Sequence, residues 1–419
     1  MRWPLLFLLL ISGTVRAQCD PNRRPVIFIH GFLASGDTWS NAVQQFQRSG
    51  YCADQLIAFD WNSVGGNAKK TDSLLSDLID RVLARSGAAQ VDLVGHSAGG
   101  GVARNYLRDS SRAKQVAHYV HIGSRKWTSA YEWFPNAKCL NIFSSGDRVA
   151  SSSAGPIEGA VNLSLQNEDH YQVATAPAPI DAMLKFFNPA IDTEKRIVKT
   201  NTVQLSGKAV TLGDNQAMGN AAISIYRIRT KDGARQSSPI RLQADASGNW
   251  GPVELKSNTA YEFELVPATE KPRIISYFFS GFSFSDPLVY LRGFPQGKQV
   301  MALLGQVPER EDQSALVIYS AASAMIGGRD SVTVNGISVC SATLTPASKT
   351  AITSFIYEDG DGVSTGRTIK QFTATPFISG IDLLLEAGEN KLLRLRYNSQ
   401  QLTLRARPSK ERVLLAVFR

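Results

Sequence analysis

The chain has 419 residues, of which 43% are hydrophobic, and its formal net charge at pH 7 is +9. The length exceeds what one compact core holds, so more than one domain is expected. Most of the positive charge lies beyond residue 190 and is spread out. The basic residues form no stripe interleaved with aromatic residues, which excludes a nucleic-acid partner. The positive charge is interpreted as a solvated surface, and weak attraction to anionic lipid or fatty acid is the alternative.

The N-terminus, MRWPLLFLLLISGTVRA, has the features of a signal peptide over residues 1–17. Arg2 gives it a positive start, residues 5–11 form a short apolar run, and residues 15–17 fit a cleavage signal. The run is too short for a transmembrane helix, and no later segment is long and apolar enough. The sequence predicts a secreted or periplasmic protein without a transmembrane segment.

Residues 18–189 alternate between apolar, strand-like runs and amphipathic, helix-like runs. The expected strands cover residues 25–31, 55–61, 91–96, 117–124 and 139–147. The expected helices cover residues 39–50, 72–87 and 180–188, and a further helix is expected directly after the motif described next. This alternation predicts an α/β domain with a mostly parallel sheet and helices on both faces.

The stretch VDLVGHSAGGG, residues 91–101, contains the pattern G-x-S-x-G around Ser97. In this motif a strand ends in a sharp turn that holds the serine, and a helix begins at once. A glycine-rich loop that merely contains serine is the alternative, but an apolar strand precedes the motif and helical spacing follows it. Ser97 is therefore predicted to be an exposed nucleophile at a helix N-terminus.

A serine nucleophile needs a histidine base, and in this topology the chain order is serine, acid, histidine. The chain has five histidines, and all of them precede residue 171. His30 follows the first strand, His96 lies inside the motif, and His118 and His121 lie in a strand where a structural role is expected. Only His170 follows a candidate acid and lies in a loop, so elimination selects it as the base.

Asp147 ends an expected strand at the same sheet edge as Ser97, which makes it the favoured acid; Glu158 is the alternative. A tetrahedral oxyanion needs donors that are already in place. The backbone N–H groups of Ala98, directly after the serine, and Phe32, after the first strand, are predicted to supply them. This chemistry requires no metal and no cofactor.

From residue 190 onward, short alternating segments are separated by Gly, Asn, Asp and Ser, which predicts an all-β fold. Residues 190–419 are termed the β-region. Its length suggests two parts, residues 190–285 and 286–419, built as β-sandwiches or barrels. The acidic turn EDGDG, residues 358–362, lacks the downstream glutamate of a calcium loop, so a plain β-turn is expected there.

Two aromatic-rich segments have two interpretations each. RKWTSAYEWFP, residues 125–135, is either core or a short lid with substrate-binding residues at Trp127, Tyr131, Trp133 and Phe134. SYFFSGFSFSDPLVYLRGF, residues 276–294, is either a half-buried strand or the wall of an acyl-chain site.

The motifs HGF, GHSAGG, SGD and EDH occur in this order and resemble those of secreted microbial lipases of the small α/β-hydrolase type. The resemblance covers about the first 190 residues and implies a minimal α/β-hydrolase. It places the strand at residues 25–31 between those at 55–61 and 91–96. It also implies hydrolysis of triacylglycerols and simpler esters through an acyl-enzyme, with Ser97, Asp147 and His170 as the triad.

The β-region resembles the C-terminal domain of archaeal long-chain lipases, and residues 190–285 resemble a transthyretin-like or carboxypeptidase-regulatory sandwich. This implies help with long-chain substrates and contact with a lipid–water interface. The implied sheet order also bears on the four cysteines. It separates Cys52 from Cys139 and brings Cys19 beside Cys52, so a Cys19–Cys52 disulfide is expected. Cys139 and Cys340 would be free or would join the two halves.

These observations favour an exported serine ester hydrolase, with an ester lipid as substrate and triacylglycerol lipase as the leading hypothesis. A polyester depolymerase, whose β-region would hold the polymer, and a thioesterase are the enzymatic alternatives. A binding protein with an inactive hydrolase fold is disfavoured by the complete set of triad residues.

Overall fold

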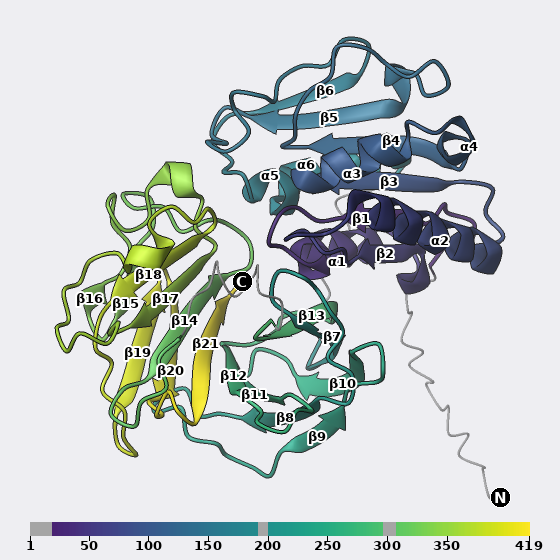
Figure 1. Ribbon diagram of the computed structural model, residues 1–419. Coiled ribbons are helices and arrows are strands. Elements are labelled where there is room, and N and C mark those ends of the chain that lie inside the picture. The colour runs from purple at the N-terminus through teal and green to yellow at the C-terminus, as the bar shows by residue number, and fades with distance from the viewer. Residues whose placement is uncertain (1–18, 192–199, 296–306) are drawn as a thin grey trace, which may run out of the picture.

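The computed structural model describes residues 19–191, 200–295 and 307–419 (Figure 1). The expected signal peptide, residues 1–17, lies outside them. The N-terminal part contains one parallel six-stranded sheet. Across it the strands are β2 (Leu56–Phe59), β1 (Val26–Ile29), β3 (Val91–His96), β4 (Val116–Ile122), β5 (Cys139–Ser144) and β6 (Val161–Leu165). This confirms the expected strand order and adds β6, which the sequence did not predict.

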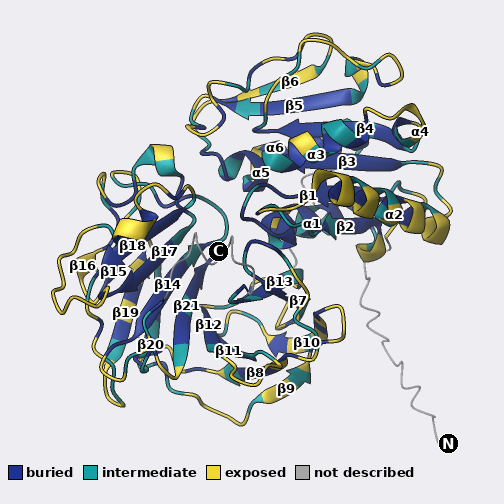
Figure 2. Cartoon of the chain, viewed as in Figure 1, coloured by how far each residue is buried: buried dark blue, intermediate teal, exposed yellow. Residues whose placement is uncertain are grey.

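Helices cover both faces of this sheet, as expected for a parallel sheet buried on two sides. On one face α1 (Ser40–Arg48), α5 (Gln172–Thr175) and α6 (Pro177–Phe187) pack against β1, β3, β4 and β5. On the other face lie α2 (Ala68–Ser86), α3 (Ala98–Tyr106) and the short α4 (Ser110–Ala113). The central strand β3, which leads to Ser97, is buried throughout (Figure 2).

In the described residues the β-region contains three sheets. The first has the order β10 (Asn249–Lys256), β7 (Thr202–Thr211), β13 (Asp286–Gly293). The largest has the order β18 (Ile378–Asp382), β17 (Thr353–Tyr357), β14 (Ala315–Ser320), β21 (Arg412–Phe418), β12 (Ile274–Phe279), β11 (Tyr261–Val266), β8 (Ala222–Arg227), β9 (Ile240–Gln243). The third has the order β16 (Ile337–Ser338), β15 (Val332–Val334), β19 (Leu392–Tyr397), β20 (Gln400–Arg405).

The eight-stranded sheet is continuous across the division expected near residue 285. Strands β8, β9, β11 and β12 precede this point, and β14, β17, β18 and β21 follow it. Strand β13, the first after it, pairs in parallel with β7. The smaller sheets pack against the eight-stranded sheet to form two apolar cores, which gives the expected sandwich architecture. The division into parts at residue 285 stays a prediction.

The β-region also packs against the N-terminal part. Leu33 and Val64 from the N-terminal part share a buried cluster with Val317 of β14, Phe355 of β17 and Val413 of β21. Neighbouring residues on these strands face the opposite way, toward the four-stranded sheet.

Among the helices that the structure describes, none is long and apolar enough to cross a membrane.

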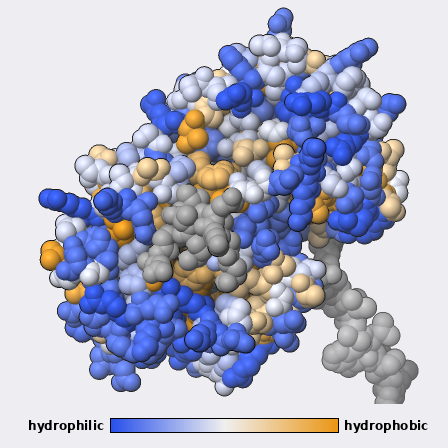
Figure 3. Space-filling model, in the orientation of Figure 1, coloured by the Kyte–Doolittle hydropathy of each residue, from blue (hydrophilic) through white to orange (hydrophobic). Residues whose placement is uncertain are grey.

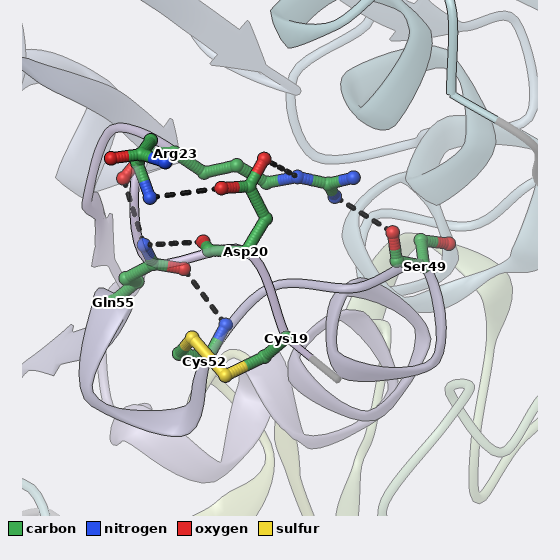
Figure 4. Close-up of a disulfide and its surroundings, with 7 residues drawn as sticks. Cys19, Asp20, Arg23, Ser49, Cys52 and Gln55 are labelled. Carbon is green, nitrogen blue, oxygen red and sulfur yellow. Dashed lines mark hydrogen bonds and ion pairs between the residues drawn. A yellow bond between two sulfur atoms is a disulfide. The ribbon is translucent and has the colours of Figure 1, made fainter. Parts of the chain in front are cut away.

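A disulfide joins the start of the described chain to the segment before β2. It links Cys19 to Cys52, as expected from the sheet order, and hydrogen bonds surround it (Figure 4). The side chain of Gln55 donates to the carbonyls of Asp20 and Arg23 and accepts from the N–H of Cys52. The other two cysteines, Cys139 and Cys340, are buried free thiols.

Loss of this disulfide should destabilise the N-terminal part. The bond closes a loop with a sequence separation of 33 residues, which corresponds to about 3.7 kcal/mol of unfolding free energy. We expect the free energy of unfolding of the variant Cys19→Ser/Cys52→Ser to be smaller by that amount. The variant should therefore unfold at a lower denaturant concentration. The wild-type protein under a reducing agent is the matched control and should unfold like the variant. Equal stability of oxidised and reduced wild-type protein would contradict the prediction.

Candidate active site

The turn after β3 forces Ser97 into an unusual backbone conformation, with φ 52° and ψ −121°. Its N–H donates to the carbonyl of Ile122, and its carbonyl accepts from Ser124 Oγ at 2.8 Å. Glycine is required two residues later, because a Cβ on Gly99 would lie 2.4 Å from the carbonyl oxygen of Ile29. Helix α3 begins at the next residue after the serine, so Oγ stands at a helix N-terminus, as predicted for this motif.

The three predicted triad residues lie in one hydrogen-bonded chain. His170 Nε2 is 2.8 Å from Ser97 Oγ, and His170 Nδ1 is 2.8 Å from Asp147 Oδ2. The other oxygen of Asp147 accepts from the N–H groups of Val149 and Ala150. Burial alone would raise the pKa of Asp147, but its hydrogen bond from His170 and those from the backbone outweigh this and lower it. The acid is therefore ionised and fixes Nε2 of the histidine as the acceptor. Glu158, the alternative acid, is exposed.

Two further side chains fix the backbone of the base, and sequence reasoning missed both. His96 Nε2 donates to the carbonyl of His170 at 2.8 Å. Burial, and then repulsion from His170, lowers the pKa of His96 to about 3, so its ring stays neutral. Asp169 Oδ1 accepts from the N–H of Tyr171 and of Gln172, which shapes the loop just after the base. The position of His96 directly before Ser97 in the motif is the one sequence feature that could have indicated its role.

The loop after β1 lies beside the serine. A Cβ built on Gly31 would come within 3.1 Å of the Ser97 Cβ, so the backbone of this loop can approach the reacting oxygen. Phe32 is the next residue and lines the pocket at Ser97. Ala98 is the first residue of α3, where the backbone N–H has no acceptor within the helix. Both predicted oxyanion donors thus lie at the serine, and their role stays a proposal.

The pocket at Ser97 is small and is formed by both parts of the chain. Thr350, Ile352 and Phe377 of the β-region line it opposite the triad. The ring of Phe377 stacks on the ring of His170, with centroids 5.8 Å apart and an interplanar angle of 19°. No sequence pattern marked Phe377, because it belongs to a segment far from the motif residues.

The structure does not bring the aromatic segment 125–135 to this pocket. Trp127 and Tyr131 lie on either side of the Arg104 guanidinium, and Trp133 donates from Nε1 to the carbonyl of Leu107. Phe134 is buried in the core under α2 and α3. Trp127 also packs against the ring of His121, with centroids 4.8 Å apart, so the segment is held by the residues around α3. None of its four aromatic residues is among the described residues that line the pocket at the serine.

The turn at residues 358–362 is the one place in the described residues where three potential metal ligands meet. Oxygen atoms of Glu358, Asp359 and Asp382 lie within 4.8 Å of one another. Glu358 is already paired with Arg310, and it also accepts from the N–H groups of two glycines within the turn. The turn is therefore stabilised by its own contacts, and no metal role is assigned to it.

Three family models match successive parts of the chain. A model described as alpha/beta hydrolase fold matches residues 24–138. A model described as lipase C-terminal domain matches residues 201–294, and a third, described as a C-terminal domain, matches residues 303–417.

Solved structures with similar folds include lipases and esterases. Lipase BlEst2 from Bacillus licheniformis is 15% identical, with a TM-score of 0.33, and the match covers 41% of this chain and 94% of that one. The naproxen esterase of Bacillus subtilis is 14% identical, with a TM-score of 0.30 and coverages of 41% and 86%. Esterase RhEst1 from Rhodococcus sp. ECU1013 is 16% identical, with a TM-score of 0.32 and coverages of 42% and 94%.

The hydrogen-bonded chain predicts a single reactive serine. A fluorophosphonate should label Ser97, and Ser97→Ala should remove both the label and nearly all turnover of an activated ester. The thermal midpoint should change little, since Oγ is a single partly exposed atom that contributes little to packing. His170→Ala should lose about as much turnover, because the two groups act together. Mass spectrometry of the labelled peptide checks the site, and a label on another serine would contradict the assignment.

The environment of Asp147 predicts that it, and not Glu158, orients the base. Asp147→Asn should lower kcat by about 10⁴-fold, because an amide cannot hold the Nδ1 proton and stabilise the imidazolium. Glu158→Gln is the matched control and should leave kcat within twofold, since this side chain is exposed. Steady-state kinetics on a soluble ester checks both variants, and the reverse pattern would show that the wrong carboxylate was chosen.

Proposed function

We propose that this chain, a serine ester hydrolase of the α/β-hydrolase family that carries a lipase C-terminal domain, is an exported triacylglycerol lipase. Its class follows from the matches to the two family models, over residues 24–138 and 201–294. The finer proposal concerns the substrate, and one observation carries it. The pocket at Ser97 adjoins a larger apolar pocket that both parts of the chain enclose.

The proposed reaction proceeds through an acyl-enzyme. His170 Nε2 takes the proton of Ser97 Oγ as the oxygen attacks the ester carbonyl carbon, and the N–H groups of Phe32 and Ala98 receive the oxyanion. Collapse of this tetrahedral species breaks the bond to the leaving alcohol, which takes the proton from His170. Water, deprotonated by the same nitrogen, then releases the fatty acid. Asp147 stays ionised throughout and stabilises the imidazolium.

The larger pocket has a mainly apolar lining. It shares Ala34, Tyr171 and Ile352 with the pocket at the serine, so the two form adjoining compartments. An apolar compartment next to the reacting carbonyl is suited to an acyl chain, because each buried methylene contributes about 0.8 kcal/mol.

The β-region supplies most of the wall of this larger pocket. The contributing residues come from β12, β13, β14, β17 and β21 and include Tyr277, Val317, Phe355 and Leu415. Tyr277 and Phe294 belong to the aromatic segment 276–294, so this segment does line the pocket in part. In Figure 3 hydrophobic surface gathers near the junction of the two parts. We therefore propose that the β-region binds the long acyl chain.

Two observations support export. The described chain begins with a cysteine that forms a disulfide, and disulfides persist in oxidising compartments. The sequence before it has the pattern of a cleaved signal peptide. A secreted or periplasmic location is thus part of the proposal.

Filling the larger pocket should shift chain-length preference. Val317 lies on β14, is 4% exposed and faces the pocket. In Val317→Phe we expect kcat/KM for a C16 ester to fall by about 50-fold, the equivalent of about three excluded methylenes. A C4 ester should be hydrolysed as by the wild type.

Ile240→Phe is the matched control, because Ile240 is exposed on the edge strand β9 of the same sheet. It should leave both esters unaffected. Equal loss at both chain lengths in a folded Val317→Phe variant would contradict the proposed acyl site.

Emulsified trioleate should be hydrolysed faster than an insoluble polyester film or an acyl thioester; the opposite ranking would favour the depolymerase or the thioesterase.

A further inference from the structure

The loop that carries Phe32 has a strained backbone. Leu33, the next residue, is left-handed with φ 59°, a conformation that costs a non-glycine residue of order 1 kcal/mol. Such a conformation persists only where its surroundings hold it. One support comes from the N-terminal part itself, where the N–H of Leu33 donates to Ser63 Oγ at 2.9 Å.

A second support comes from one side chain of the β-region. Asn215 lies in the turn after β7 and is itself left-handed, which asparagine tolerates. Its Nδ2 donates to the carbonyl of Ala34 at 2.9 Å and to the carbonyl of Trp61 at 3.0 Å. Its Oδ1 accepts from Ser35 Oγ at 2.5 Å. One amide therefore holds the two residues that follow the strained position.

The same amide reaches the histidine that begins the loop. His30 Nδ1 lies 2.8 Å from the carbonyl of Gly31 and donates to it, which leaves Nε2 as an acceptor. Nε2 lies 3.2 Å from Asn215 Nδ2 and 3.2 Å from the backbone nitrogen of Trp61. Burial lowers the pKa of His30 to about 4, against the opposing effect of Asp60, so the ring is a neutral acceptor near neutral pH. Asn215 thus contacts the loop at both ends.

We propose that Asn215 is a positioning residue. Through it the β-region holds the loop that carries Phe32, here termed the oxyanion loop, in the conformation that presents the Phe32 N–H to the substrate oxygen. The inference rests on the proposed function, because it takes the N–H of Phe32 as an oxyanion donor. Asn215 touches no reacting atom. Its effect should appear where charge develops on the substrate oxygen, in kcat, and not in the binding of the uncharged ester.

The test uses the full chain and a short soluble ester, so that the acyl pocket plays little part. Asn215→Gly keeps a residue suited to φ 53° and removes every side-chain contact. We expect kcat to fall by about 10- to 100-fold, somewhat less than the loss of an oxyanion donor itself, with KM within twofold. A boronic acid, which forms a tetrahedral adduct with Ser97, should bind more weakly by a similar factor.

Asn220→Gly is the matched control, since Asn220 is an exposed left-handed asparagine in the following turn, and it should behave as the wild type. Asn215→Asp is the second variant if Asn215→Gly does not fold. It keeps the shape but places a carboxylate oxygen where Nδ2 donates, against the carbonyls of Ala34 and Trp61, and should lower kcat further.

The outcomes separate the two proposals. If the wild type neither hydrolyses esters nor is labelled at Ser97, the proposed function fails. If the wild type is active and the Asn215 variants keep kcat within twofold of Asn220→Gly, the positioning role is overturned. It is also overturned if kcat falls while the boronic acid binds as before, because a loss of folded protein, and not of oxyanion stabilisation, would then explain the change.

Discussion

The left-handed backbone at Ser97 is the constraint on which the rest of the site depends. Its N–H and carbonyl are both held from the β4 side, by Ile122 and Ser124, so the turn cannot relax. Because strand and helix meet here at close range, Gly99 cannot carry a side chain without meeting the carbonyl of Ile29. The turn exposes Oγ at the carboxyl edge of a parallel sheet. The loops that carry His170, Asp147 and the proposed oxyanion donors leave that same edge.

Those loops are held from two directions, and the second direction is the β-region. Arg329 pairs with Asp169, next to the base, at 2.9 Å, and the N–H of Ala324 donates to the same carboxylate. A carboxylate that is 2% exposed needs such partners, since an unpaired buried charge is costly. Phe377 stacks on His170, and Asn215 holds the oxyanion loop. A minimal hydrolase sheet without a cap thus gains both its apolar wall and part of its loop order from the appended sheets.

Local signals explain what the sequence could predict. The places of Ser97, Asp147 and His170 follow from short motifs, because strand ends and turns are specified by adjacent residues. The strand order was implied by the resemblance to small lipases that these motifs carry. Strand β6 escaped prediction since most of its residues are exposed and it shows no apolar run. The aromatic segment 125–135 was ambiguous for another reason: aromatic residues suit a lid and a core equally, and only the contacts with Arg104 distinguish them.

Long-range pairing is what the sequence left open. The pairing of β13 with β7 brings together residues about 80 positions apart, and nothing near residue 285 indicates it. Asn215 presents the same difficulty. Within LGDNQ it has the composition of an ordinary turn, and its left-handed φ needs no further explanation. Its partners lie about 150 to 185 positions away, so its role is visible only once the two parts are packed together.

This packing changes how the two parts should be regarded. From sequence, the β-region is an accessory that extends the acyl site of a self-sufficient hydrolase. In the structure Leu33 and Val64 are 6% and 7% exposed because strands of the β-region cover them. Without those strands both side chains would face water, and the carbonyls of Ala34 and Trp61 would lose the amide that fixes their direction. Water can replace such a hydrogen bond, but it cannot hold a left-handed residue in place. The constraint on the oxyanion loop therefore belongs to the whole chain, so hydrolysis of even a short ester should depend on the β-region.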